Sequence, residues 1–363
     1  MNELSSADQP MLAETQPKTL VTGAAKEDYY CRLSNENTVP LWEIRGRLAP
    51  REPGNAFAPA FWSYEKVKQL LMESGTFITE REAQRRVLTL ENPGRRGGNH
   101  ITGTLFAGVQ LILPGEIAPS HRHVASALRF IMEGDGAYTA VDGERTTMQP
   151  GDFIVTPSWT FHDHGNPTNH PVIWLDGLDT GLINTFDCSF FEMYSEEEYP
   201  ATGNYGDAFA RFGENMAPIE YKPTRLATPS LIYPYERSRT ALDRLYRSGS
   251  VDSCHGVKLQ YINPVTGGFA MPTIATFLQF LPSGFEGSPY RSTDATVFCV
   301  REGRGRSNVG RSVFSWTPND VFVVPSWCPV SHRADSDAIL FSFSDRAAQK
   351  ALGVWREQAP VSL

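Results

Sequence analysis

From about residue 100 onward, short apolar runs separated by glycine- and proline-containing turns dominate the chain. The segments TLFAGVQLILPG, ALRFIMEGDGAYTAVDGE and GDFIVTP follow one another at the spacing of β-hairpins. This pattern is typical of an antiparallel sandwich or barrel. Upstream, apolar positions between 63 and 75 recur at helical spacing, with Ser63 as the expected N-cap and Gly75 as the stop. A last helix is expected over 345–352.

The same texture returns near residue 256, and the sequence repeats itself there. GDFIVTPSWTFHDH (151–164) aligns with NDVFVVPSWCPVSH (319–332), and EGDG (133–136) aligns with EGRG (302–305). Ordered matches at a nearly constant offset indicate two copies of one β-domain.

The repeat suggests a division of the chain into five segments. We expect an N-terminal arm with helices, a first β-domain, a connecting segment, a second β-domain, and a C-terminal helix with a tail. Their expected bounds are 1–100, 101–190, 191–255, 256–345 and 346–363. The first 20 or so residues are polar and are expected to be poorly ordered.

Composition narrows the class of protein. The chain has 363 residues, 33 Lys+Arg against 41 Asp+Glu, and a net charge of −8, which argues against nucleic acid as a partner. Its five cysteines are scattered and form no C-x-x-C pair, which argues against a disulfide framework. No apolar stretch approaches the length of a membrane span, and the N-terminus lacks a secretory pattern, so we expect a cytoplasmic protein.

The histidines carry the strongest chemical signal. His121 and His123 in PSHRHVASALRF lie two apart, so on a strand they project to the same face, where two imidazoles can share one metal ion. PSWTFHDHGN supplies His162 and His164 about forty residues later. In the second copy, the positions of His121, His123 and His162 carry Tyr, Ser and Val, whereas His332 matches His164. His121, His123 and His162 are therefore the predicted metal ligands, and the second copy is predicted to be metal-free.

These residues also support a family resemblance. The spacing is similar to that of the two cupin motifs, which here comprise Gly115, His121, His123, Gly151, Pro157, His162 and Asn166. The glutamate that many cupins place after the His-x-His pair is absent. Longer segments, including RRVLTLENPG, GDFIVTPSWTFHDHGN and WLDGLD, resemble gentisate 1,2-dioxygenases, from about residue 40 to the C-terminus. The resemblance implies an all-β dominated bicupin, and only the first cupin is expected to bind metal.

The resemblance further implies an iron(II) enzyme of aromatic catabolism with one Fe(2+) per chain, usually a homotetramer. Such an enzyme uses O2 to open the ring of a small aromatic ortho-hydroxy carboxylate, here 2,5-dihydroxybenzoate, and yields maleylpyruvate. Three histidines alone suit zinc, nickel or copper equally, so iron depends on the resemblance.

Substrate-contacting residues follow from strand position and the resemblance together. Arg129 interrupts an apolar run beside the metal pair, and we expect it to bind the substrate carboxylate. Arg85 is a second candidate, although Arg86 could exchange roles with it. His164 and Asp176 are candidate catalytic residues. Gln110 and Phe106 are expected to line the substrate pocket.

Two alternatives stay open at the level of sequence. One is a salicylate or 1-hydroxy-2-naphthoate 1,2-dioxygenase on the same scaffold. The other is a non-catalytic bicupin that binds or stores a ligand, because the second copy shows that this fold persists without the three histidines.

Overall fold

The computed structural model describes residues 23–54, 56–201, 205–214 and 216–360, so the segment expected to be poorly ordered lies outside it. The chain divides into two units, one ending at Gly54 and one beginning at Asn55. The first contains α1 (Gly23–Asn35) and α2 (Leu41–Leu48), neither of which has a buried residue. No helix in the described ranges has both the length and the apolar character that crossing a membrane requires.

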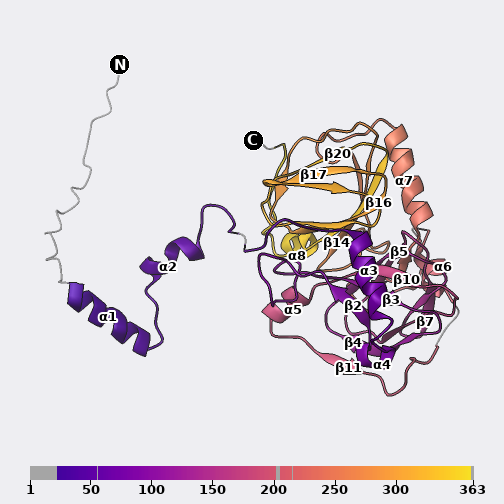
Figure 1. The fold of residues 1–363 in the computed structure, drawn as a ribbon, viewed down its shortest axis with the longest axis horizontal. Helices are drawn as coiled ribbons and strands as arrows, with labels where there is room; N and C mark the ends of the chain where they lie inside the picture. The colour runs from indigo at the N-terminus through magenta and orange to yellow at the C-terminus, as the bar shows by residue number, and fades with distance from the viewer. Residues whose placement is uncertain (1–22, 55, 202–204, 215, 361–363) are drawn as a thin grey trace. The chain divides into compact units, whose positions relative to one another are not determined.

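The second unit contains two sets of antiparallel sheets, one from each copy of the repeat (Figure 1). In the first set, a six-stranded sheet has the order β12-β8-β5-β10-β3-β2 and a five-stranded sheet the order β11-β4-β9-β6-β7. Its strands are β2 (Arg86–Thr89), β3 (Phe106–Ile112), β4 (Ile117–His123), β5 (Ala127–Glu133), β6 (Tyr138–Val141), β7 (Glu144–Thr147), β8 (Phe153–Thr156), β9 (His162–Gly165), β10 (Val172–Leu178), β11 (Phe191–Met193) and β12 (Ile232–Tyr233).

The second set repeats this arrangement. A six-stranded sheet of order β1-β19-β16-β21-β14-β13 is accompanied by β18-β17-β20 and by the pair β15-β22. Its strands are β1 (Ala60–Trp62), β13 (Val257–Gln260), β14 (Ala275–Leu281), β15 (Arg291–Ser292), β16 (Thr296–Glu302), β17 (Gly305–Val309), β18 (Ser312–Trp316), β19 (Val321–Val324), β20 (Val330–Ala334), β21 (Ala338–Ser344) and β22 (Glu357–Gln358). The mostly-β bicupin fold expected from the sequence is confirmed.

Each repeat contributes its first strand to the sheet of the other repeat. β1 precedes the first copy but pairs with β19 of the second, and β12 precedes the second copy but pairs with β8 of the first. The helix after each strand returns to its own copy: α3 (Tyr64–Ser74) contacts β2 and β3, and α7 (Tyr235–Arg247) contacts β13 and β14. The repeat therefore begins near residues 60 and 232.

Side chains reinforce this exchange in matching pairs. The Tyr64 amide donates to Asp320 of the second copy, and its hydroxyl donates to Glu133 of the first. The Tyr235 amide donates to Asp152 in turn, and the Tyr235 hydroxyl donates to Glu302.

Two buried carboxylates join the copies in the same reciprocal manner. Asp179 of the first copy accepts from the Ser126 amide and from the Thr273 hydroxyl of the second copy. Asp345 of the second copy accepts from the Ala295 amide and from the Thr104 hydroxyl of the first.

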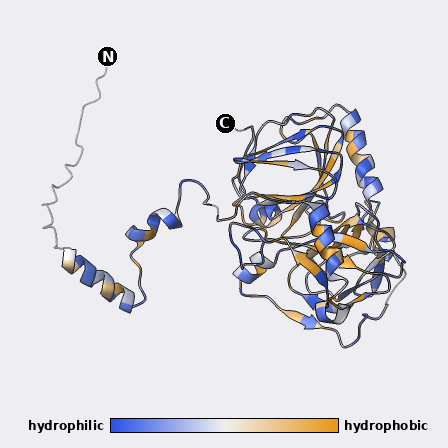
Figure 2. Cartoon of the chain, in the orientation of Figure 1, coloured by the Kyte–Doolittle hydropathy of each residue, from blue (hydrophilic) through white to orange (hydrophobic). Residues whose placement is uncertain are grey.

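One hydrophobic core spans both copies. The Phe130 and Phe341 rings stack with their centroids 4.1 Å apart. The ring centroids of Phe153 and Tyr261 lie 4.9 Å apart. In Figure 2 the strands of this unit carry most of the hydrophobic colour, whereas α7 shows both colours along its length. The two copies therefore share buried surface and form one folding unit.

The expected helices at 63–75 and 345–352 are confirmed as α3 and α8 (Arg346–Ala351). Several other short helices were not predicted, namely α4 (Glu80–Ala83), α5 (Thr180–Thr185), α6 (Asp207–Phe212) and the longer α7. Residues 56–100 belong to the compact unit, and the segment expected as a plain connection carries β12 and α7.

Candidate active site

Two paired strands place the three predicted ligand residues together. β4 carries His121 and His123, β9 carries His162, and the register sets His121 directly opposite His162. The ring centroids of His121 and His162 lie 4.2 Å apart, and those of His123 and His162 lie 4.8 Å apart. One nitrogen from each ring lies within 4.8 Å of the other two.

The unused nitrogen of each imidazole fixes its orientation. The Nδ1 atoms of His121, His123 and His162 lie 2.8, 2.7 and 3.0 Å from backbone carbonyl oxygens, to which each N–H donates. All three Nε2 atoms are buried and have no hydrogen-bond partner among the described residues. Since Nδ1 carries the proton, each Nε2 presents its lone pair, and these unsatisfied buried acceptors fit a metal ion.

Burial keeps these rings uncharged. It lowers the pKa of His121 to about 3 and that of His123 to about 4, and the nearby Arg85 guanidinium acts in the same direction. The pKa of His162 is lowered well below its ordinary value, again mainly by burial. Neutral imidazole is the form that binds metals, so no proton has to leave these rings near neutral pH.

A cavity of about 290 Å³ opens beside His123. Its lining combines two arginines and a carboxylate with apolar and hydroxyl groups. The lining residues are Ala83, Gln84, Arg85, Val87, Thr89, Phe106, His123, Ala127, Arg129, Asp176, Leu178 and Thr180. The space suits a single-ring anion that approaches the histidine cluster.

Three neighbouring side chains contact the Arg129 guanidinium. Its Nη1 donates to Thr156 Oγ1 at 2.5 Å, its Nη2 lies 2.9 Å from His164 Nε2, and its Nε lies 3.5 Å from Asp176 Oδ1. Burial lowers the Arg129 pKa to about 10, which still leaves the guanidinium charged at neutral pH, and Asp176 opposes the shift. A guanidinium has five N–H groups, so donors remain for a ligand.

Arg85 and Arg86, which the sequence could not separate, have different surroundings. Arg86 is buried and donates to both oxygens of Glu116, at 2.9 and 2.7 Å. Arg85 lines the cavity, and no hydrogen bond or ion pair engages its guanidinium among the described residues. Burial lowers the Arg85 pKa, and Asp176 opposes this effect. Arg85 is thus the cation with free donors at the cavity.

His164 and Asp176 both contact Arg129. His164 Nδ1 lies 3.0 Å from the Thr139 hydroxyl, so both nitrogens of this buried ring have partners. Asp176 accepts from the Trp174 indole N–H at 3.1 Å. Burial raises the Asp176 pKa, and the two arginines oppose that shift.

Phe106 lines the cavity, whereas Gln110 does not. Gln110 is buried and borders a separate space of about 10 Å³. Sequence reasoning did not single out Thr156, Thr139 or Trp174, which hold the Arg129 cluster in place. Strand parity offered a signal for Thr156, because β8 pairs with β5 and sets Thr156 opposite Ala127.

In the second copy, the positions that match the histidine cluster and the Arg129–Asp176 pair carry different residue types. Tyr290 pairs with Val330 as His121 pairs with His162. The β14–β21–β16 register sets Phe298 beside Ser342, where the first copy has Arg129 beside Asp176. His332 donates to or accepts from Ser307 at 2.8 Å, as His164 does with Thr139. Among the described residues, the first copy alone contains a candidate metal cluster.

Comparisons with known proteins agree with this geometry. A family model described as a cupin domain matches residues 108–177. Gentisate 1,2 dioxygenase 1 of Aquipseudomonas alcaligenes is 53% identical over 340 residues, covering 94% of this chain and 98% of that protein. 5-Aminosalicylate 1,2-dioxygenase of Comamonas sp is 35% identical over 333 residues, covering 90% of this chain and 88% of that protein. The crystal structure of salicylate 1,2-dioxygenase from Pseudoaminobacter salicylatoxidans with gentisate adducts matches with a TM-score of 0.87 and 34% identity, covering 95% of this chain and 96% of that chain.

Proposed function

Because this chain belongs to the family of gentisate 1,2-dioxygenases, we propose that it cleaves the ring of 2,5-dihydroxybenzoate with O2 and yields maleylpyruvate. Both oxygen atoms enter the product. One observation carries the proposal: a cluster of three oriented imidazoles lies beside a cavity that His123 lines together with Arg85 and Arg129. This combination suits an aromatic ligand that bears a carboxylate.

The resident metal in this proposal is iron(II), one ion per chain, held by His121, His123 and His162. When bound, iron supplies a redox-active centre with open positions for an ortho-hydroxy carboxylate and for O2. The donor set fits, because three neutral nitrogens lie within 4.8 Å of one another and have no other partner in the described part of the chain.

Arg85 and Arg129 divide the recognition of the substrate. Arg85 binds the carboxylate directly, because its fork matches two oxygens and no hydrogen bond or close ion pair occupies it in the described part of the chain. Arg129 offers its remaining N–H groups from a fixed position. His164, with both nitrogens occupied, acts as a positioning residue for Arg129.

Asp176 is the candidate group for holding a proton. It lines the cavity, and burial raises its pKa while Arg129 and Arg85 oppose the rise. It can therefore accept a proton from the substrate hydroxyl as the ring is oriented. Phe106 and Val87 form an apolar wall that limits which ring substituents fit.

A second candidate function is cleavage of salicylate or 1-hydroxy-2-naphthoate. The similarity to relatives named for salicylate, 5-aminosalicylate and 1-hydroxy-2-naphthoate favours it. A ring with one hydroxyl is harder to oxidise than a ring with a second hydroxyl in the para position. We therefore expect gentisate to be the better substrate.

Oxygen uptake tests the proposal. The full chain is loaded with iron(II) and mixed with gentisate or salicylate under air, while product absorbance is followed. We expect uptake with gentisate, its loss after a chelator, and a lower kcat/KM for salicylate. Equal efficiency with both substrates would replace the narrow assignment. Binding of gentisate without oxygen uptake would support a non-catalytic bicupin instead.

The proposal also covers the oligomeric state of the protein and its location in the cell. We expect a homotetramer in the cytoplasm, in line with the family resemblance. Light scattering of the purified full chain gives the mass of the assembly, and a mass equal to one chain of 40.4 kDa would contradict it.

A further inference from the structure

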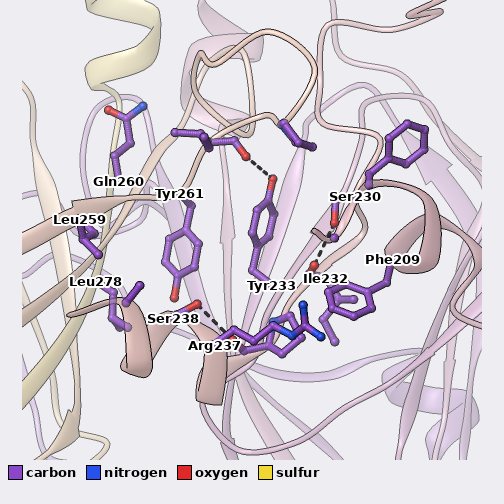
Figure 3. Close-up of a pocket in the computed structure, with 16 residues that line it drawn as sticks. Phe209, Ser230, Ile232, Tyr233, Arg237, Ser238, Leu259, Gln260, Tyr261 and Leu278 are labelled. Atoms are coloured by element: carbon purple, nitrogen blue, oxygen red, sulfur yellow. Dashed lines mark hydrogen bonds between the residues drawn. The ribbon is translucent and has the colours of Figure 1, made fainter. Parts of the chain in front are cut away.

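A second cavity, of about 240 Å³, lies between α6, β12, α7 and β13 (Figure 3). It shares no lining residue with the cavity beside the histidines. Its walls are aromatic and aliphatic, with Phe209, Tyr233, Tyr261, Leu259 and Leu278 among them. Its size is close to that of the candidate active-site cavity, so a single aromatic ring fits it.

Three of the polar side chains that line this cavity are placed to contact a ligand. The Tyr261 hydroxyl is buried and makes no hydrogen bond of regular geometry among the described residues; its polar neighbour is the Ser238 side chain, toward which it points in Figure 3. The Ser238 hydroxyl donates to the Pro234 carbonyl, so its oxygen can still accept a hydrogen bond. Arg237 lies at the exposed end, where its guanidinium covers the Phe209 ring at 4.8 Å and pairs with Glu214.

The two copies of the repeat differ at three positions that line this cavity in the second copy. Tyr64 and Tyr235 occupy matching positions at the starts of α3 and α7, so Ser238 matches Val67 and Ala241 matches Leu70. Tyr261 likewise matches Leu90, because each donates its amide to the next strand at the same point of the register. The first copy thus has three apolar side chains where the second has a small residue and two hydroxyls.

We propose that this cavity is a second binding site for a single-ring aromatic carboxylate that also bears a hydroxyl group. The ring lies among Phe209, Tyr233 and the aliphatic walls. The ligand hydroxyl satisfies Tyr261 and Ser238 at the closed end, and the carboxylate reaches Arg237 at the open end. A buried hydroxyl that lacks a well-formed hydrogen bond and borders a cavity of ligand size is the observation that carries the assignment. The inference is independent of the proposed reaction.

The probe for this site is 4-hydroxybenzoate. Its carboxylate and hydroxyl lie at opposite ends of the ring, so it cannot chelate a metal through adjacent oxygens. Isothermal titration calorimetry on the metal-loaded full chain measures its affinity. We expect saturable binding at one site per chain that persists in Arg85→Ala, which removes the carboxylate-binding arginine of the candidate active site. Absence of saturable binding, or its loss in Arg85→Ala, overturns the proposal.

Two kinds of variant locate the bound probe. The double variant Ser238→Val with Ala241→Leu copies the first repeat and should raise Kd at least about tenfold by filling the space. Tyr261→Phe keeps the ring but removes the hydroxyl, and should raise Kd by about 3- to 10-fold, the value of one hydrogen bond. Thr240→Leu, on the exposed side of the same helix, is the matched control and should leave Kd unchanged. An unchanged Kd in both Tyr261→Phe and the double variant would also overturn the proposal.

Discussion

At the scale of single residues, the Nδ1 atom of each ligand histidine matters as much for metal binding as the Nε2 atom that would contact the metal. The carbonyls that hold His121, His123 and His162 belong to Pro119, Ala125 and Thr160, each two positions away along the chain. The backbone of the same strand or turn therefore sets the tautomer. This arrangement makes the cluster ready for a metal before the metal arrives.

The first prediction concerns metal content. His121→Ala leaves two imidazoles, so we expect bound iron to fall from about one per chain to less than about a tenth, as measured by elemental analysis. His332→Ala is the matched control, since it removes a buried histidine from the second copy. Retention of iron in His121→Ala, or equal loss in the control, would contradict the assigned ligands.

The second prediction separates the two arginines. Arg85→Ala and Arg129→Ala should both retain iron and raise the KM for gentisate, by about tenfold or more, because each removes charge-assisted donors. Arg129→Ala should also destabilise the fold by about 3–5 kcal/mol, since it leaves Asp176 buried without its partner. Arg85→Ala should cost little stability. Steady-state kinetics and denaturant unfolding measure these effects, and loss of iron in either variant would refute the roles.

At the scale of elements, the buried pair Arg86–Glu116 links β2 to the turn before β4. Arg86 also donates to the Ile78 carbonyl, and Glu116 accepts from the Leu113 amide. These contacts hold the strand that begins next to Arg85. The pair therefore supports the cavity wall without facing the ligand.

The third prediction follows from this pair. Arg86→Met should lower the free energy of unfolding by about 3–5 kcal/mol, because the largely enclosed Glu116 carboxyl group would lose its cationic partner. Arg211→Met breaks the exposed pair with Asp207 and should cost less than about 1 kcal/mol. Urea unfolding compares the two variants, and similar losses in both would contradict the argument.

Sequence periodicity was sufficient to predict the elements whose pattern lies in residues close together along the chain. The His-x-His parity, the helix after Ser63 and the offset of the repeats were all readable from neighbouring residues. The helix α7 was missed, although Tyr235, Leu242 and Leu245 recur at helical spacing, because Tyr, Glu and Pro residues around it suggested a loop. The pairing of β1 with β19 spans about 260 residues and leaves no local pattern. Whether Arg85 or Arg86 pairs with Glu116 likewise depends on the tertiary structure, in which Arg86 forms the ion pair.

At the scale of the whole molecule, Asp179 and Asp345 make stability depend on pH. Burial raises the pKa of each from 3.8 to about 6. Between these values the folded state binds more protons than the unfolded state, so the contribution of these groups to stability decreases as pH rises from about 4 to 6. Above pH 6 the full penalty of burying the charge remains.

The fourth prediction tests this linkage with Asp179→Asn. The amide has the same shape, can accept from the Ser126 amide and can donate to the Thr273 hydroxyl. The Tm of the variant relative to that of the unaltered chain should therefore increase between pH 4 and pH 7, as calorimetry would show. A Tm difference that is independent of pH would refute the proposed titration.

The fifth prediction concerns the metal-free second copy. Deleting residues 256–363 removes the partner strand of β1 and exposes Phe130 and Phe153. We expect the remaining chain to be insoluble or to lack cooperative unfolding. Recovery of a soluble, active protein with an assembly of normal size would show that the second copy is dispensable.

The exchange of first strands has a consequence for ancestry. A polypeptide with only one such repeat could not complete its own six-stranded sheet, and would need another molecule to supply β1. Two identical molecules satisfy each other in this way, and the product is a symmetric dimer with two metal centres. Fusion of the two genes would keep the paired arrangement within one chain, and only one of the two metal centres would then be needed. Loss of the ligands from the other centre would give the residues found there, Tyr290, Ser292 and Val330.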